Sequence, residues 1–398
     1  MPNASSPPFI GRCELDWFLE CSNCAATAAP DGLPTVCPRC GLPWLVRYHR
    51  SFDRSLKDAL PSRPGSMWRY RALLPVLPGE EPVSLGEGAT PLLRSVRLAE
   101  RLGARDLWIK DEAPNPTGSF KARGLAAAVT RAVAGGALRF VLPTAGNAGV
   151  AAAAYAARAG AAVRVFAPNT TPQPLLAQMQ AFGADVVTIT GHIGDCGKLA
   201  RQYGTEQGAF DLSTLREPYR IEGKKTLGLE LAEQQDWRPA GAIIYPTGGG
   251  TGLIGMWKAF GELIAAGWMR GPMPRLFTVQ AAGCAPVVKA FEAGASTTEA
   301  WPEPWTVAAG LRVPGPLGGA LMLRALRESR GGALAVTDAE LTGGARLLSS
   351  LEGVDACPEG GAAVAAAQKL IQRGIIAREE RIVLFNTGAG VLYGRDFT

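Results

Sequence analysis

Apolar runs alternate with polar, glycine-marked segments from about residue 85 to the end of the chain. Short apolar runs, such as residues 139–143 and 162–166, predict buried strands. Longer alanine- and leucine-rich runs, such as residues 149–159 before Gly160, predict helices that end at a glycine. Further strands are expected at 105–110, 185–190, 242–245, 276–279 and 381–385, a loop and helix at 118–133, and further helices at 172–182, 253–266 and 360–372.

This order of strand, helix, strand, helix predicts an α/β fold with parallel sheets covered by helices on both faces. A chain of 398 residues with 47% hydrophobic content is long enough for a large core and too long for one ordinary domain. We therefore expect two domains and a small appendage. In such sheets, ligands bind beyond the carboxyl ends of the strands, where a loop leads into a helix.

Charge and hydropathy exclude two classes of partner. Lys and Arg number 41 against 35 Asp and Glu, and the resulting charge of +6 is too small to indicate nucleic-acid binding. Arginines interrupt the alanine-rich stretch 124–168 before it reaches the roughly 18 apolar residues of a membrane helix. Arg12, Glu14 and Asp16 lie where a signal peptide would be apolar. We expect a cytoplasmic protein with no membrane or nucleic-acid partner.

Four of the eight cysteines form two Cys-x2-Cys pairs, Cys21 with Cys24 and Cys37 with Cys40. Cytosolic thiols stay reduced, and each pair can present two thiolates to a tetrahedral ion. The spacing predicts a zinc ribbon over residues 17–48. Four thiolates leave no open coordination position, so the metal would be structural. The sequence leaves open whether the ribbon contacts nucleic acid, docks a partner or closes the N-terminus.

The chain has only two histidines, which argues against a Ser-His-Asp triad, so another group must move protons. Lys121 follows the turn-rich residues 115–120 and begins an apolar helix. The helix dipole and burial both disfavour an ammonium group at this place, and a neutral amine is a nucleophile. The alternative is an ordinary solvated lysine in a first helical turn.

Two further loops lie between a predicted strand and a predicted helix. Residues 142–149 offer backbone N–H groups and the Asn147 amide to an anion or a ring hydroxyl, although Asn147 could equally cap the helix. Residues 246–252 contain three successive glycines, whose amides can curl around a phosphate. This loop lacks the Gly-Lys-Thr/Ser ending of a nucleotide P-loop, which suggests a single phosphate group.

Together and in this order, the three segments resemble those of fold-type II pyridoxal-phosphate enzymes, and their details are most similar to the threonine synthase family. The resemblance implies a two-domain fold like that of the tryptophan synthase β chain, with parallel sheets flanked by helices. It implies a large cofactor domain over 51–130 and 214–398, a small mobile domain over 131–213, and a ribbon with an N-terminal extension over 1–50. Further matching segments are 85–92, 181–185, 218–226, 309–314, 357–360 and 386–390.

The resemblance also implies the cofactor contacts. Lys121 would join covalently to the pyridoxal-phosphate aldehyde and then act as the base. Phe120 would pack near the ring, and Asn147 would bond the ring hydroxyl. Thr387 would face the ring nitrogen, where a hydroxyl does not stabilise a pyridinium as an aspartate would, which favours elimination and replacement at the β and γ carbons. The phosphate would be held by Gly248, Gly249, Gly250, Thr251 and Gly252.

The reaction implied by the family converts O-phosphohomoserine and water to threonine and phosphate, in an enzyme expected to be a homodimer. Its small amino-acid substrate carries a carboxylate and a phosphate, and both need partners. The carboxylate is expected to meet Thr144, Ala145 and Gly146, and the phosphate Arg123 or Lys224, with Arg220, Lys225 and Arg312 as further cations.

Three departures leave the substrate open. Ala145 stands where the family usually carries a hydroxyl, Leu392 stands where many members carry a lysine, and the glycine loop is also similar to that of serine/threonine dehydratases. The alternative is therefore a dehydratase-like β-eliminase or another β/γ-replacement lyase, such as cysteate synthase.

A hypothesis from another class is an inactive scaffold or a nucleic-acid-binding ribbon. It would need an exposed basic and aromatic face on the ribbon. Packing of the ribbon's aromatics against the body is the simpler interpretation. The residues that could form such a face are Trp17, Trp44, Arg39, Arg47 and Arg50.

Overall fold

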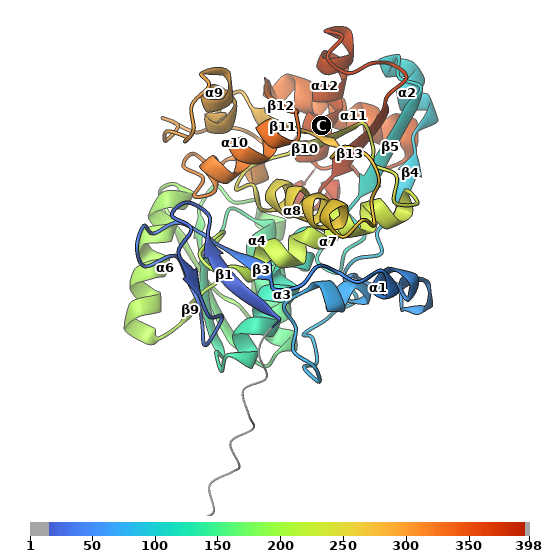
Figure 1. Cartoon of the computed structure of the whole chain (residues 1–398). Coiled ribbons are helices and arrows are strands. Elements are labelled where there is room, and N and C mark those ends of the chain that lie inside the picture. The colour runs from blue at the N-terminus through green and yellow to red at the C-terminus, as the bar shows by residue number, and fades with distance from the viewer. Residues whose placement is uncertain (1–15, 395–398) are drawn as a thin grey trace, which may run out of the picture.

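The computed structural model describes residues 16–394, which form three sheets with helices around them (Figure 1). The largest sheet has six strands, of which five run parallel, as the alternating pattern predicts. The edge strand β4 is antiparallel to β5, so the sheet is mixed. Its strands, in order across the sheet, are β12 (Gly332–Val336), β11 (Arg275–Ala281), β10 (Ala242–Pro246), β13 (Arg381–Asn386), β5 (Asp106–Asp111) and β4 (Leu92–Arg94).

Helices cover both faces of the six-stranded sheet because successive strand residues point to opposite sides and both sides are apolar. Ile243 joins one hydrophobic cluster and its neighbour Ile244 joins the other. The cluster of Ile244 lies under α2 (Val96–Leu102), α11 (Asp338–Glu352) and α12 (Pro358–Gln372). The cluster of Ile243 lies under α7 (Tyr219–Gln234), α8 (Thr251–Ala265), α9 (Pro286–Glu292) and α10 (Gly319–Glu328).

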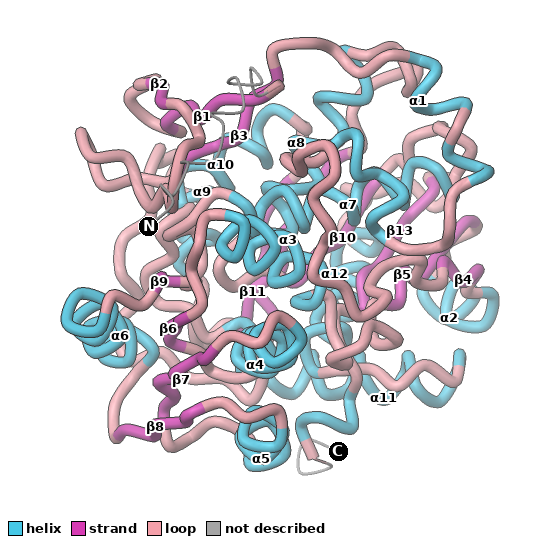
Figure 2. Tube along the Cα trace, turned by 90° about the horizontal axis from the view of Figure 1, so that it is seen from below, coloured by secondary structure: helices cyan, strands magenta, loops and turns pink. Residues whose placement is uncertain are grey.

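The second sheet has four parallel strands in the order β8, β7, β6, β9. Phe140 and Leu142 pack under one layer of helices, whereas Val141 packs with α6 on the other face (Figure 2). The strands are β6 (Arg139–Pro143), β7 (Ala162–Pro168), β8 (Asp185–Ile189) and β9 (Phe210–Asp211), and the helices are α3 (Lys121–Ala134), α4 (Asn147–Arg158), α5 (Gln173–Ala181) and α6 (Ile193–Gln207). These strands lie within the predicted small domain, whose boundaries stay a prediction.

The N-terminal ribbon is a three-stranded antiparallel sheet of β1 (Trp17–Cys21), β2 (Thr27–Ala28) and β3 (Trp44–Tyr48). Trp17 and Trp44 are buried in one cluster with Tyr219 of α7, and Arg47 pairs with Glu20 at 2.8 Å. The aromatics therefore pack the ribbon against the body, as the simpler interpretation predicts. Residues 1–15 of the expected N-terminal extension lie outside the described part.

Short helices connect the ribbon to the sheets and border the later loops. No described helix has the length and apolar character that crossing a membrane requires. The short elements are α1 (Arg54–Asp58), η1 (Leu60–Ser62), η2 (Met67–Leu73), η3 (Ala309–Leu311) and η4 (Gly390–Tyr393).

Helix α7 is missing from the sequence prediction, and it is buried over most of its length. It packs against both α8 and α3, so it lies between the helices of the two sheets. Glycine makes this approach possible, because a Cβ at Gly223 would overlap the backbone carbonyl of Arg123 in α3. The close crossing brings the polar side chains of α7 to the start of α3.

Candidate active site

Lys121 is the first residue of α3, and the loop before it is fixed by the segment after β13. Phe120 N–H donates to the carbonyl of Thr387 at 3.0 Å, and Ala389 N–H donates to the carbonyl of Gly118 at 2.8 Å. Desolvation lowers the pKa of Lys121 to about 7, and the charge of Arg220 acts in the same direction. The Lys121 amine therefore loses its proton more readily than a solvated lysine does, which favours the interpretation of Lys121 as a nucleophile.

The ring of Phe120 has two lysine amines close to it. The Nζ of Lys121 is 4.4 Å from its ring centroid, and the Nζ of Lys224 is 4.0 Å from it. The Lys224 amine also donates to the carbonyl of Phe120. Burial holds the pKa of Lys224 well below its usual value, and Lys121 and Arg220 add to that effect. Lys224 is thus a buried neighbour of Lys121 whose amine is bonded to the protein backbone, and its contact with a substrate phosphate stays a prediction.

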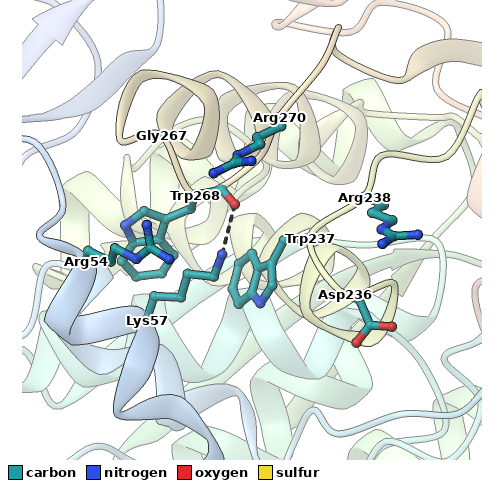
Figure 3. Close-up of a pocket in the computed structure, with 8 residues that line it drawn as sticks. All are labelled: Arg54, Lys57, Asp236, Trp237, Arg238, Gly267, Trp268 and Arg270. Atoms are coloured by element: carbon teal, nitrogen blue, oxygen red, sulfur yellow. Dashed lines mark hydrogen bonds between the residues drawn. The ribbon is translucent and has the colours of Figure 1, made fainter.

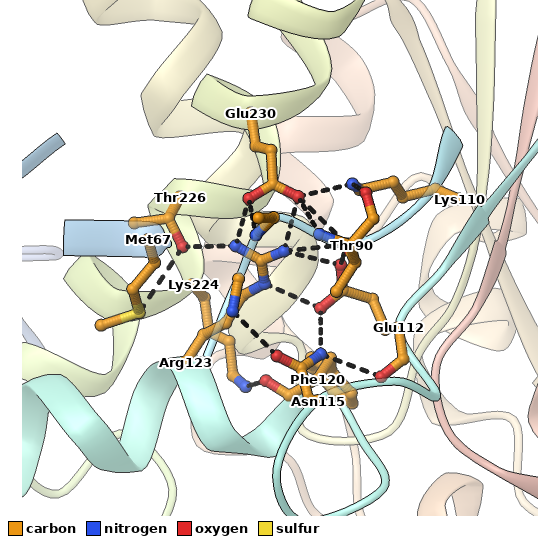
Figure 4. Close-up of polar contacts among 12 residues, drawn as sticks. Met67, Thr90, Lys110, Glu112, Asn115, Phe120, Arg123, Lys224, Thr226 and Glu230 are labelled. Carbon is orange, nitrogen blue, oxygen red and sulfur yellow. Dashed lines mark hydrogen bonds and ion pairs between the residues drawn. The ribbon is translucent and has the colours of Figure 1, made fainter. Parts of the chain in front are cut away.

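The guanidinium of Arg123 is bound to carboxylates inside the protein (Figure 4). Its guanidinium forms paired contacts with Glu112 at 2.7 and 2.9 Å and with Glu230 at 2.9 and 3.0 Å, and all three side chains are buried. Removing one partner of such a buried network costs roughly 3–5 kcal/mol. Because its donors are used inside the protein, Arg123 is a support of α3 and not a substrate contact, and the prediction that it binds substrate is wrong.

The Arg123 network reaches the lysine loop through an amide. Asn115 donates from Nδ2 to Glu112 at 2.9 Å, while its Oδ1 accepts from Gly88 N–H at 3.1 Å. Lys110 completes the charge balance with a 2.6 Å contact to Glu230. The residues before Lys121 are therefore held by buried ionic groups rather than by a flexible turn.

The glycine loop after β10 meets the start of α8. The N–H groups of Gly248, Gly249, Gly250 and Thr251 donate to no acceptor within residues 16–394. Gly250 has a φ of 84°, and a Cβ there would overlap Met322. A Cβ at Gly252 would overlap the hydroxyl of Tyr245, whose ring lies 5.9 Å from that of Phe120. The loop is a cradle of free amides at a helix N-terminus, which suits a phosphate.

The loop after β6 offers backbone donors, but its threonine is used internally. Thr144 Oγ1 donates to the carbonyl of Gly146 at 3.1 Å and accepts from the N–H groups of Gly146 and Gly149. Its single hydrogen is therefore taken, so a direct Thr144 contact to substrate does not fit this geometry. The N–H groups of Ala145 and Asn147 have no acceptor in the described chain, so they are the donors that this loop offers.

Asn147 begins α4 and faces the segment after β13. Its Nδ2 donates to the Tyr393 hydroxyl at 3.0 Å, and its Oδ1 is buried without a hydrogen-bond partner in the part of the chain that the structure describes. A Cβ at Gly388 would lie 3.5 Å from that Nδ2. The side chain is thus placed beside the Lys121 loop, because Gly388 also pairs with Ser119.

Thr387 and Glu359 complete the surroundings of Lys121. Thr387 is buried, with its Oγ1 3.8 Å from the Sγ of Cys357. Glu359, in the first turn of α12, accepts from Gly310 N–H at 2.7 Å, and its charge raises the pKa of Lys121. The sequence reasoning gave Glu359 no role, because an acid in a first helical turn is ordinary. Only its burial distinguishes it.

These groups fit a pyridoxal-phosphate cofactor. A lysine with a lowered pKa can join the aldehyde of the cofactor. The free N–H groups at the start of α8 can donate hydrogen bonds to its phosphate. Two buried polar atoms beside them, Ser119 Oγ and Asn147 Oδ1, lack a protein partner. Such orphaned groups are rare in proteins unless a ligand or water satisfies them.

Arg312 lies near Ala145 of the loop after β6. It lines a narrow pocket together with Ala145, Thr170 and His192, which come from the other sheet and its helices. The free volume is about 10 Å³, roughly the space of one water. Arg312 is half-buried, forms no ion pair among the described residues, and packs over Trp305 at 5.4 Å. Of the cations proposed for a substrate phosphate, it is the one that faces the Ala145 loop.

The cysteine spacing leads to a compact cluster. The Sγ atoms of Cys21, Cys24, Cys37 and Cys40 lie within 4.8 Å of one another. Cys21 and Cys40 are separated by 3.4 Å, and Cys24 and Cys37 by 3.7 Å. A tetrahedron with zinc–sulfur bonds of about 2.3 Å places its sulfurs about 3.8 Å apart, so the four thiols suit one tetrahedral metal.

Known proteins share both the sequence and the fold. A family model described as pyridoxal-phosphate dependent enzyme matches residues 83–388. The threonine synthase of Methanosarcina acetivorans is 35% identical over 94% of this chain and 91% of its own length, and that of Methanocaldococcus jannaschii is 34% identical over 94% and 92%. Maize serine racemase has a TM-score of 0.66 at 22% identity, covering 76% of this chain and 88% of its own. The expected resemblance is confirmed: the chain belongs to the fold-type II family of pyridoxal-phosphate-dependent enzymes.

Proposed function

We propose that this enzyme is a threonine synthase, a lyase that converts O-phosphohomoserine and water to threonine and phosphate. The observation that carries the proposal is the arrangement of Lys121, the free-amide loop at α8 and Arg312 beside Ala145, in a chain whose relatives are threonine synthases. The reaction needs a base and two separate sites for dianions. Lys121, the free-amide loop at α8 and Arg312 are the groups that we assign to these three tasks.

Each step of the proposed reaction would use a different group of the protein. When bound, the cofactor withdraws electrons from the substrate's α carbon. The amine of Lys121 takes the α proton and later moves a proton at the β carbon. The N–H groups of Ala145 and Asn147 orient the substrate carboxylate, and Arg312 holds the leaving phosphate. Thr387, as a neutral neighbour, leaves the ring without a fixed positive charge.

Substrate comparison tests the proposal. We expect the holoenzyme to release phosphate from O-phosphohomoserine, and to form keto acid from threonine or serine at a much lower rate. Lys121→Ala should lose both the cofactor's visible absorbance and turnover, because no other lysine holds its place at the start of α3. Arg312→Gln should raise KM for O-phosphohomoserine about tenfold or more, the loss of one charged contact, while the absorbance is kept. Efficient keto-acid release with no phosphate release would replace the synthase by the dehydratase alternative.

We further propose that the four cysteines hold a structural zinc ion, on the support of their tetrahedral spacing. The proposed reaction requires no nucleic acid and no membrane, and its substrate is a small amino acid. The cytoplasmic location expected from the sequence and the expected homodimer stay predictions, and light scattering of the purified holoenzyme would check the homodimer.

A further inference from the structure

A second pocket lies away from Lys121, where the ends of α7 and α8 meet α1 (Figure 3). Its volume is about 300 Å³, within the range of small-molecule sites. None of the residues that line it belongs to the cofactor site described above. They are Arg54, Lys57, Asp236, Trp237, Arg238, Gly267, Trp268 and Arg270.

The pocket carries four cations against one acid. The exposed side chains of Arg54, Arg238 and Arg270 form no ion pair and no hydrogen bond within residues 16–394. Cations near helix C-termini often bond the last carbonyls, but only Lys57 does so here, to the carbonyl of Trp268 at 3.0 Å. Capping therefore accounts for one of the four cations and leaves three without a partner.

The cations already affect one another. Burial lowers the pKa of Lys57, and the charges of Arg54 and Arg270 act in the same direction. Like charges at close range are unfavourable unless an anion neutralises them. A bound anion would remove this repulsion.

The pocket wall is aromatic and is shaped by unusual backbone. The rings of Trp237 and Trp268 meet edge to face with their centroids 5.5 Å apart, and the Nζ of Lys57 lies 4.6 Å from the Trp237 centroid (Figure 3). Asp236 and Trp237 are consecutive non-glycine residues with φ of 53° and 60°. The neighbouring end of α8 uses Gly267, with φ of 68°, for the same turn. Strain of this kind is kept where the surrounding structure has a use for it.

We propose that this pocket binds a small phosphate ester attached to a flat ring, the chemistry of a nucleoside monophosphate. The cations would contact the dianionic phosphate, and the half-buried Trp237 indole would pack against the ring. A volume of about 300 Å³ is many times the roughly 10–15 Å³ that one water needs, so it leaves room for more than a bare phosphate. The proposal does not depend on which reaction the enzyme catalyses.

Calorimetry with adenosine 5′-monophosphate as the probe tests the pocket, using the full chain loaded with cofactor so that the cofactor phosphate site is filled. We expect one binding site per chain, and inorganic phosphate should bind at least about tenfold more weakly because it lacks the ring. The double variant Arg54→Gln, Arg270→Gln should weaken adenosine monophosphate binding about tenfold or more. Trp237→Leu should weaken the nucleotide but leave phosphate binding unchanged.

Arg373→Gln is the matched control, because Arg373 is an exposed arginine just after a helix, α12, and it lies outside the pocket. It should bind the nucleotide as the unchanged chain does. The proposal is wrong if adenosine monophosphate shows no binding at about 1 mM. It is equally wrong if the double variant binds as tightly as the Arg373→Gln control, since the probe would then lie elsewhere.

Discussion

Three effects act on the pKa of the Lys121 amine at once. Desolvation is the largest effect and lowers its pKa, Arg220 lowers it further, and Glu359 raises it, with a result of about 7. A lysine in water has a pKa near 10.4, so at neutral pH almost none of it is a free amine. In this site roughly half of the amine is free at pH 7, and a nucleophile is available without a separate base.

Cofactor loading should therefore depend on pH in a defined direction. Only the neutral amine attacks an aldehyde, so the rate of loading should rise with pH through a midpoint near 7 and level off above about 8. The measurement is the growth of visible absorbance after pyridoxal phosphate is added to cofactor-free enzyme between pH 5.5 and 9. A midpoint near 10 would mean that Lys121 is solvated and that its surroundings do not shift its pKa.

Glu359 provides a test of one neighbour alone. Glu359→Gln keeps the shape and the acceptor for Gly310 N–H, but it removes the charge that raises the pKa of Lys121. We expect the midpoint of cofactor loading to move to lower pH, measured in the same absorbance assay. Glu340→Gln, in α11, removes a carboxylate that pairs with Lys369 and should leave the midpoint unchanged. A midpoint that moves up in Glu359→Gln would reverse the assigned electrostatic role.

At the scale of elements, the turn from β10 into α8 has no room for side chains at its glycines. Gly252 has ordinary helical backbone, so any side chain there is excluded by space alone, namely by the Tyr245 hydroxyl. Tyr245 in turn packs its ring against Phe120 and Phe385. A change at this glycine would therefore be passed to the ring beside Lys121.

We predict that Gly252→Ala lowers cofactor affinity about tenfold or more and destabilises the fold by about 1–3 kcal/mol, as overpacking does. Equilibrium absorbance titration and urea unfolding would measure the two effects. Gly343→Ala is the matched change in α11, where a Cβ meets nothing within 4 Å, and it should stabilise the helix by roughly 0.5–1 kcal/mol. Equal cofactor affinity in the two variants would show that the amide cradle tolerates a side chain.

The same scale shows what the sequence could predict. β5, β6, β7, β10, β11 and β13 lie where apolar runs predicted strands, because a strand covered on both faces needs nothing but apolar residues. Helix α7 could not be found in this way. It buries Glu222, Lys224, Lys225 and Glu230, a composition typical of an exposed face, and their partners come from distant segments such as Tyr48 and Lys110.

Site prediction had the same limit. Lys121 and the glycine loop carry local signals, namely a loop that leads into a helix and successive missing side chains. The error over Arg123 arose because its partners, Glu112 and Glu230, lie on separate elements. That its donors are all used by these carboxylates can be seen only in the three-dimensional structure. Glu359 and Tyr393 were missed for the same reason, since each reaches the site from far along the chain.

At the scale of the whole molecule, a buried polar network joins the ribbon to α7, the helix that also carries Lys224 beside Phe120. Tyr48, at the end of β3, donates to Glu222 of α7 at 2.6 Å, and Lys225 of the same helix pairs with Glu222 at 2.8 Å. Lys258 of α8 joins at 2.9 Å. Glu222 lies two residues from both Arg220 and Lys224, which surround Lys121. The ribbon is thus attached to the helix that tunes the amine.

Loss of the metal from the ribbon should therefore lower the stability of the whole protein. Cys24→Ser removes one of the four ligands, so we expect elemental analysis to find less than one zinc per chain. We also expect the melting temperature to fall by at least about 3 °C, which is the shift that a loss of roughly 1 kcal/mol gives in a large domain. Activity should be partly kept, because no cysteine of the cluster is among the groups around Lys121. Tyr48→Phe is the companion variant, since it cuts the link to Glu222 but leaves all four thiols: it should keep its zinc and still lose stability. If Cys24→Ser retains both full zinc content and the original melting temperature, the four thiols do not form a structural metal site.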